Sequence, residues 1–309
     1  MSDAVDRVRN AAREIPLVRD HARTWRDNRY VYPVISRRAG GLSIGINLSP
    51  SKACNFHCVY CQVNRRCTPV AEKVDSGSPI GELNAMLDWV VSGQVWQDPH
   101  FAGVPKDLRR LNDIAFSGDG EPTLCRDFPN LVRLAGDARD LHRLKDVKII
   151  VITNATRLHT QAFQRALPLL RDRNGEVWAK LDAGSAEHFT RVHRGSVPFK
   201  AVLANIESLA QVMPVVIQSC FFRLDGEGPS ETEIELYIAR LRHILEVGGR
   251  LKFVQVYSIA RSPAEPSISA LPDEELDAIA GHVRHALEDV PVATYYGADV
   301  QPQQPDSGQ

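Results

Sequence analysis

Strand-like apolar runs alternate with helix-like segments about six times along this chain, and this alternation constrains the fold more than any other feature. The clearest strand is residues 148–153, where consecutive isoleucine and valine residues indicate burial on both faces of a parallel sheet. The clearest helix begins near Gly81, because apolar residues recur after it at the spacing of one helix face. Strands and helices that alternate in this way predict a parallel sheet with helical crossovers. Similar patterns predict strands at residues 42–48, 113–117, 177–182, 216–220 and 253–257, an edge strand at 290–296, and helices at 159–171, 231–245 and 273–288.

A second feature is a short loop with the spacing Cys-x3-Cys-x2-Cys, formed by Cys54, Cys58 and Cys61. A loop this short offers three thiolates to one centre, and thiolates favour zinc and iron–sulfur clusters. Structural zinc usually takes four ligands, whereas no fourth cysteine or histidine follows at the usual spacing and His57 is poorly placed to join. Three thiolates on a four-iron cluster would leave one iron without a protein ligand, which makes such a cluster one candidate. A zinc knuckle or a redox-active trio stays open as the alternative.

Composition and charge exclude few functions, but they narrow the expected cellular location. The chain has 309 residues and a net charge of −1, so charge alone does not indicate nonspecific binding to nucleic acid. The first residues lack the pattern of a signal peptide, and no apolar run is long enough to span a bilayer. We therefore expect a cytoplasmic protein without a membrane partner. The clustered cysteines do not resemble a disulfide framework.

The chain is expected to divide into three parts. Residues 1–40 are rich in arginine and predict a helical or extended arm, residues 41–297 a barrel domain, and residues 298–309 a polar, disordered tail. Acidic residues dilute the basic charge of the arm, which favours a solvated segment packed on the domain. Contact with phosphate groups or nucleic acid is the alternative interpretation.

Polar residues on three predicted strands indicate a cavity inside the sheet. Alternation along residues 177–182 places Trp178, Lys180 and Asp182 on the face opposite the helices. Such a face is too polar for an ordinary core, so we interpret it as the wall of a substrate cavity. Lys180 is a candidate acid, base or imine former if burial lowers its pKa, and a salt bridge with Asp182 is the alternative. The polar members of this wall are Lys180, Asp182, Gln218, Gln255 and Tyr257.

The cysteine loop, with Tyr60 before its last cysteine, resembles the cluster loop of the radical S-adenosylmethionine (SAM) enzymes. The resemblance implies a partial (β/α)6 barrel and a 4Fe–4S cluster held by Cys54, Cys58 and Cys61. It further implies that the open iron binds SAM, and that SAM is cleaved reductively to a 5′-deoxyadenosyl radical. An electron donor such as flavodoxin or ferredoxin is then expected as a partner.

A second motif, Gly118-Asp119-Gly120-Glu121, follows the strand at 113–117. It is similar to the Gly-Gly-Glu motif with which the family binds the amino group of SAM, although Asp119 replaces the first glycine. A turn of this kind after any strand, with Glu121 as a helix cap, is the simpler interpretation. The resemblance also places Asn154 and Asp182 where family members contact SAM, but either residue can instead cap the next helix.

Longer pieces between residues 40 and 265 resemble a bacterial subgroup similar to the wyosine-synthesis enzymes, which modify transfer RNA. Those enzymes carry a second cluster on cysteines that precede the SAM loop, whereas this chain has only Cys67, Cys125 and Cys220 to spare. The sequence therefore predicts a radical SAM oxidoreductase or transferase whose substrate is an RNA base, a small metabolite or a peptide. The alternatives are a zinc-stabilised RNA-binding or scaffold protein, and an activase that acts on a partner protein.

Overall fold

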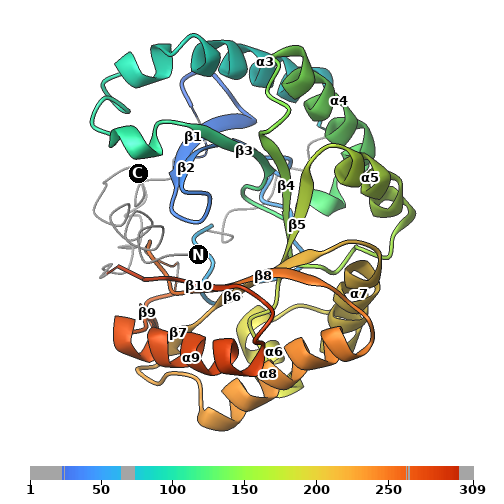
Figure 1. The fold of residues 1–309 in the computed structure, drawn as a ribbon, viewed down its shortest axis with the longest axis vertical. Coiled ribbons are helices and arrows are strands. Elements are labelled where there is room, and N and C mark those ends of the chain that lie inside the picture. The colour runs from blue at the N-terminus through green and yellow to red at the C-terminus, as the bar shows by residue number, and fades with distance from the viewer. Residues whose placement is uncertain (1–22, 24, 64–73, 262, 264, 299–309) are drawn as a thin grey trace.

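The computed structural model describes residues 23, 25–63, 74–261, 263 and 265–298, and its main feature is one strongly curved sheet (Figure 1). The hairpin of β1 (Val31–Ser36) and β2 (Gly41–Ile46) lies at one end of this sheet. The order is β1-β2-β3-β4-β5-β6-β8-β10, and every neighbouring pair after the hairpin is parallel. The remaining strands are β3 (Leu111–Phe116), β4 (Lys148–Thr153), β5 (Gly175–Lys180), β6 (Val215–Cys220), β8 (Leu251–Tyr257) and β10 (Val292–Tyr295).

Helices cover the outer face of this curved sheet (Figure 1). The expected α/β partial barrel is therefore confirmed. A small second sheet, β7 (Phe222–Leu224) with β9 (Ile268–Ala270), lies beside the barrel. The helices are α3 (Gly77–Val91), α4 (Phe128–Leu141), α5 (Gln161–Asp172), α6 (Ala186–His193), α7 (Phe199–Val212), α8 (Glu231–Glu246) and α9 (Asp273–Ala286). The short 3-10 turns among the described residues are η2 (Gln94–Gln97), η3 (Lys106–Leu108) and η4 (Pro122–Leu124).

The sheet begins earlier than the sequence predicted. β1 lies within the segment expected to be an arm, and its six residues pair with β2 from Val31 opposite Ile46 to Ser36 opposite Gly41. Five of these six residues are buried, so the strand packs on both faces and lacks the alternation that marks a half-exposed strand. The rest of the predicted arm, the predicted tail and Cys67 lie outside the described residues.

Alternate residues of β5 serve two different cores, as predicted. Val177, Ala179 and Leu181 join the large core between sheet and helices. Trp178 instead packs inside the barrel with Ala115, Ile150 and Val216. The barrel interior is therefore apolar at the level of Trp178. The polar residues that follow along the strands lie closer to the carboxyl ends of the sheet.

The start of α8 supports the start of α6. The hydroxyl of Ser230 accepts a hydrogen bond from the backbone N–H of Glu233, which is half of a capping box. The Glu233 carboxylate does not turn back to its own helix but accepts from the backbone N–H groups of Gly184 and Ser185. This contact fixes α6, the helix that ends at His193 beside the cysteine loop.

Across the described residues, no helix combines the length and the apolar character that a membrane crossing requires.

Candidate functional site

The cysteine loop follows β2 at the carboxyl end of the sheet and is fixed against α6. The backbone N–H groups of His57 and Val59 donate to the carbonyl groups of His193 and Val192, at 2.8 and 2.9 Å. Val59 is fully buried in a small apolar cluster that also contains Phe222 of β7. The three thiols at Cys54, Cys58 and Cys61 are half-buried. The loop is thus a rigid, partly shielded support for sulfur ligands.

The glycine-rich turn after β3 contacts this loop directly. The backbone N–H of Glu121 donates to the carbonyl of Ala53 at 3.1 Å. A Cβ atom on Gly120 would lie 1.9 Å from that same carbonyl oxygen, so only glycine fits at this approach. Two motifs about 60 residues apart in the sequence therefore meet at one point in the fold.

Glu121 braces the ends of two strands. Its carboxylate accepts hydrogen bonds from the hydroxyl groups of Thr123 and Thr153, at 2.6 and 2.7 Å. It also accepts from the backbone N–H groups of Thr123 and Asn154, at 3.1 and 2.7 Å. Burial raises the pKa of Glu121, although these hydrogen bonds oppose the shift. The carboxylate thus joins the loop after β3 to the end of β4, and its contact with SAM stays a prediction.

Asn154 holds the cysteine loop from the other side. Its side-chain amide donates to the side-chain oxygen of Asn55 at 2.8 Å, and its nitrogen lies 3.9 Å from the sulfur of Cys54. The Asn154 oxygen accepts from the hydroxyl of Thr156 at 2.7 Å. The structure therefore places Asn154 beside the cysteine loop, and its contact with SAM stays a prediction.

Asp182 is the centre of a buried polar network. Its carboxylate accepts from the Tyr60 hydroxyl at 2.6 Å and from the backbone N–H of Cys220 at 2.7 Å. The Lys180 ammonium lies 3.0 Å from the same carboxylate and donates to the hydroxyl of Tyr257. Lys180, Asp182 and Tyr257 are thus brought together, as the sequence predicted, and Tyr60 of the cysteine loop joins them.

The environment of Lys180 agrees with the expected salt bridge to Asp182 and not with the expected lowering of its pKa. Burial by itself lowers the pKa of Lys180, but the Asp182 carboxylate, followed by Tyr257 and Cys220, raises it above its ordinary value. The lysine is therefore held as a cation in a salt bridge. A lowered pKa, which an imine-forming lysine needs, is not what this environment produces.

His193 belongs to the site, although no sequence motif marks it. Its Nδ1 lies 3.2 Å from the sulfur of Cys58, and its Nε2 lies 3.7 Å from the Asp182 carboxylate. The ring stacks on Phe56 with centroids 4.7 Å apart. Burial lowers the pKa of His193 to about 4, so the ring is neutral at pH 7. Only the fold reveals this residue, because it follows Cys58 by 135 positions.

Gln218 and Gln255 form a neighbouring buried pair inside the barrel. Both are fully buried, and the Gln218 amide donates to the Gln255 oxygen at 2.7 Å. Within the described part of the chain, the Gln218 oxygen and the Gln255 amide nitrogen have no hydrogen-bond partner. Unsatisfied polar atoms are rare in ordinary cores. Neither glutamine lines the two cavities described next, so their place in a substrate wall stays a prediction.

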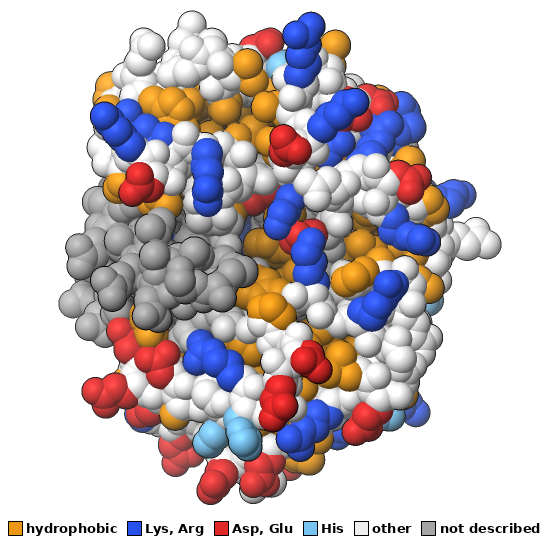
Figure 2. All heavy atoms as spheres, viewed as in Figure 1, with side chains coloured by type: hydrophobic (Ala, Val, Ile, Leu, Met, Phe, Trp, Pro, Cys, Tyr) orange, Lys and Arg blue, Asp and Glu red, His pale blue; other side chains and the backbone are white. Residues whose placement is uncertain are grey.

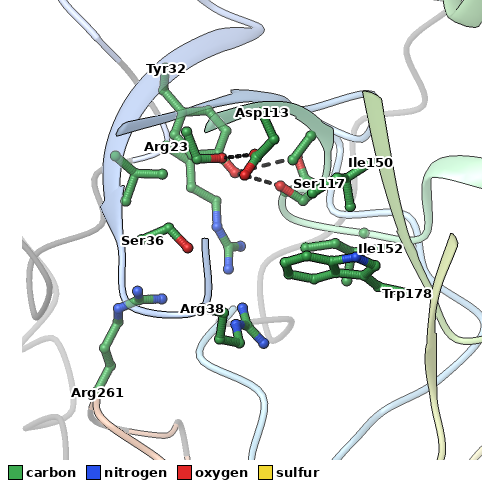
Figure 3. Close-up of a pocket in the computed structure, with 15 residues that line it drawn as sticks. Arg23, Tyr32, Ser36, Arg38, Asp113, Ser117, Ile150, Ile152, Trp178 and Arg261 are labelled. Atoms are coloured by element: carbon green, nitrogen blue, oxygen red, sulfur yellow. Dashed lines mark hydrogen bonds between the residues drawn. The ribbon is translucent and has the colours of Figure 1, made fainter. Parts of the chain in front are cut away.

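Two cavities adjoin within the barrel. A cavity of about 190 Å³ is lined by Gly118 and Gly120 and reaches the barrel interior at Trp178 (Figure 3). A cavity of about 620 Å³ lies at the amino ends of the strands, where Phe253 and Lys148 line it. Both are lined by Arg38, Asp113, Ile150 and Trp178.

The buried carboxyl group of Asp113 should make the free energy of unfolding depend on pH. Burial raises its pKa from 3.8 to about 7, so between these values the unfolded chain releases a proton that the folded chain keeps. Stability should therefore fall as pH rises from about 4 to about 7 and level off above. Asp113→Asn should lose this dependence and gain roughly 2–4 kcal/mol over the parent at pH 8. Urea unfolding at several pH values measures it, with the exposed Asp172→Asn as control. An unchanged pH profile in Asp113→Asn would contradict the assignment.

The donor set suits a cluster held by thiolates. Among the described residues, no three histidine, cysteine or acidic side chains converge as the ligands of one metal ion. A 4Fe–4S cluster makes a different demand, because each thiolate binds its own iron and the sulfurs lie further apart. Three cysteines on one braced loop, next to a glycine turn, supply the thiolates that such a cluster needs.

A curved parallel sheet with a three-thiol loop after its first parallel strand, facing a glycine turn, defines a class of barrels built around an iron–sulfur cofactor. The sequence model of the radical SAM superfamily matches residues 48–241, which is more than half of the chain. This chain belongs to the radical SAM superfamily, whose enzymes use a 4Fe–4S cluster and SAM. The family expectation drawn from the cysteine loop is therefore confirmed.

Individual relatives are distant. The chain is 24% identical over 249 residues to a protein of Brachyspira hyodysenteriae named GTPase Obg, covering 79% of this chain and 32% of that protein. The first curated relatives are covered over 32% to 61% of their length. Among solved structures, a radical SAM methyltransferase from Sphaerobacter thermophilus aligns with a TM-score of 0.56 and 14% identity, over 87% of this chain and 69% of that one.

A structure of TYW1, a wyosine-synthesis protein, with a lysine–pyruvate adduct bound aligns with a TM-score of 0.51 and 16% identity. This alignment covers 80% of the present chain and 74% of the TYW1 chain. Likenesses at this level of identity show a shared fold, which agrees with the curved sheet described above.

Proposed function

We propose that this chain is a radical SAM oxidoreductase or transferase whose cluster is held by Cys54, Cys58 and Cys61. The observation that carries the proposal is the contact between Ala53 and Gly120, which joins the thiol loop to the turn expected to bind SAM. When bound, the cluster would supply the electron that cleaves SAM to a 5′-deoxyadenosyl radical. The cavities inside the barrel support a substrate site next to it.

The side chains around the cysteine loop position and shield the reacting groups. Tyr60 and Asp182 restrain each other at one wall of the site through a 2.6 Å hydrogen bond. Lys180, held as a cation, supplies a hydrogen-bond donor and a positive charge to a substrate oxygen. The neutral ring of His193 packs beside Cys58 and adds no charge to the thiol. These roles need no proton transfer before the substrate binds.

The proposed substrate is an RNA base, a small metabolite or a peptide. TYW1 carries a lysine–pyruvate adduct in its structure, but here the salt bridge with Asp182 favours a binding role for Lys180 over an imine. On the face in Figure 2, basic and acidic side chains intermix, which offers no broad basic surface to a nucleic acid. A one-electron donor of the flavodoxin or ferredoxin kind is the partner that the proposed chemistry needs.

The proposal is tested by reconstituting the full chain with iron and sulfide without air, and then adding a reductant and SAM. We expect about four irons per chain and the formation of 5′-deoxyadenosine. Zinc at about one per chain, with no iron and no SAM binding, would instead support the zinc-protein alternative. Iron bound without any 5′-deoxyadenosine would refute the radical function.

A further inference from the structure

Three arginines converge on the smaller cavity. Arg23 precedes β1, Arg38 lies in the turn between β1 and β2, and Arg261 follows β8. Their guanidinium groups point toward the same space, which the ring of Trp178 closes on the opposite side (Figure 3). The hydroxyl of Ser36 points into this space as well. Segments far apart in the sequence thus present their charges at one place.

Among the described residues, this cavity gathers more basic than acidic side chains. Asp113 is the carboxyl group in the described lining, and Asp119 beside it pairs with Arg23 at 2.5 Å. Arg261 also donates to the side-chain oxygen of Gln62 at 3.1 Å. Burial raises the pKa of Asp113 to about 7, so this group is only partly ionised at neutral pH. Burial, followed by the charges of Arg38, Arg37 and Arg23, lowers the pKa of Arg261 well below its ordinary value. The cations therefore repel one another, and an anion between them would relieve the repulsion.

Asp119 helps to build this arrangement. It stands where the family's motif has a glycine, and its carboxylate binds both Arg23 and the side-chain amide of Asn47, the latter at 2.7 Å. The substitution therefore couples the turn expected to bind SAM to the arginine cluster. A plain glycine at this position would leave Arg23 without that anchor.

We propose that Arg23, Arg38 and Arg261 bind the phosphate group of a small phosphorylated substrate inside the barrel. Guanidinium groups bind phosphate oxygens in pairs of parallel hydrogen bonds, and a phosphate monoester carries close to two negative charges at pH 7. Three converging guanidinium groups can donate to all the oxygens of a phosphate monoester, whereas a carboxylate or a phosphodiester offers fewer charged oxygens.

The cavity of about 190 Å³ is below the usual size of a complete ligand site, so it suits one anionic end of a molecule. The adjoining cavity of about 620 Å³ has room for the remainder. This inference rests on the proposed function only in calling the ligand a substrate.

The test measures binding to the full chain with its reconstituted cluster, in the absence of a reductant. Glycerol phosphate is titrated by calorimetry at constant ionic strength, with glycerol and acetate as matched probes. We expect glycerol phosphate to bind, and both controls to bind at least about 10-fold more weakly. Arg38→Gln and Arg261→Gln should each weaken binding by about 10- to 100-fold, because each removes a charged hydrogen-bond donor. Arg165→Gln, on the exposed face of α5, should bind like the parent.

Two further readouts separate this site from other roles of the arginines. Without phosphate, the melting temperature of Arg261→Gln should equal or exceed that of the parent, because the variant lacks one of the repelling cations. Added phosphate should raise the melting temperature of the variant by less than that of the parent. Saturating SAM should leave phosphate binding intact. Displacement of glycerol phosphate by SAM would assign the arginines to the SAM carboxylate and overturn the proposal, as would equal binding of glycerol. An oligonucleotide that binds more tightly than glycerol phosphate would also overturn it in favour of RNA.

Failure here is distinct from failure of the proposed function. Binding is measured without cleavage of SAM, and 5′-deoxyadenosine formation is measured without glycerol phosphate. Either result can therefore be negative while the other is positive.

Discussion

Cys58→Ser is expected to lose the cluster and to reduce 5′-deoxyadenosine formation to the rate seen without enzyme. Burial, followed by the charges of Asp182 and Cys61, raises the pKa of the Cys58 thiol. Binding of iron has to release that proton. Serine keeps the shape but is a poor ligand for a soft metal. Iron analysis and chromatography of the nucleoside product measure the effect.

Cys125→Ser is the matched control, because it removes a half-buried thiol outside the cysteine loop. We expect it to keep its iron and its rate. A Cys58→Ser protein that retains a full cluster and cleaves SAM would show that another set of ligands holds the iron.

Asp182→Ala is expected to lower the free energy of unfolding by about 3–5 kcal/mol, because it leaves the buried Lys180 cation without its carboxylate. The same change removes the acceptor for the Tyr60 hydroxyl and for the backbone N–H of Cys220. Urea unfolding of the apo-protein measures the loss. Asp172→Ala, at the exposed end of α5, is the control and should change stability by less than about 0.5 kcal/mol.

Asp182→Asn separates charge from shape. The amide can still accept from Cys220, but it no longer holds the proton on Lys180, so the pKa of the lysine should fall. Reductive methylation by formaldehyde, followed by peptide mass analysis, should then modify Lys180 faster than in the parent at pH 7. An equal rate in both proteins would mean that the salt bridge does not control this lysine.

The features found from the sequence are those that depend on local spacing. The cysteine loop, the turn at residues 118–121 and the two faces of residues 177–182 each follow from neighbours along the chain. The face carrying Lys180 and Tyr257 was found because period-two alternation survives in buried parallel strands wherever polar residues interrupt them.

What was missed depends on contacts between distant segments. β1 lacks alternation because it is buried on both faces, and arginines around it suggested a solvated arm. His193 reaches Cys58 only through the packing of α6, and no spacing predicts it. The direction of the Lys180 pKa shift required the 3.0 Å distance to Asp182, because burial and a nearby anion act in opposite directions. The convergence of Arg23, Arg38 and Arg261 likewise arises only from the curvature of the sheet.

The adjoining cavities have a kinetic consequence. The larger one lies at the amino ends of the strands, whereas the cysteine loop lies at their carboxyl ends, and Arg38, Asp113, Ile150 and Trp178 border both. SAM and a second reactant that arrives from the opposite end of the barrel do not have to pass through one entrance. Neither molecule should block the other, so we expect random order of addition, with initial-rate plots that intersect and no dead-end inhibition by excess SAM.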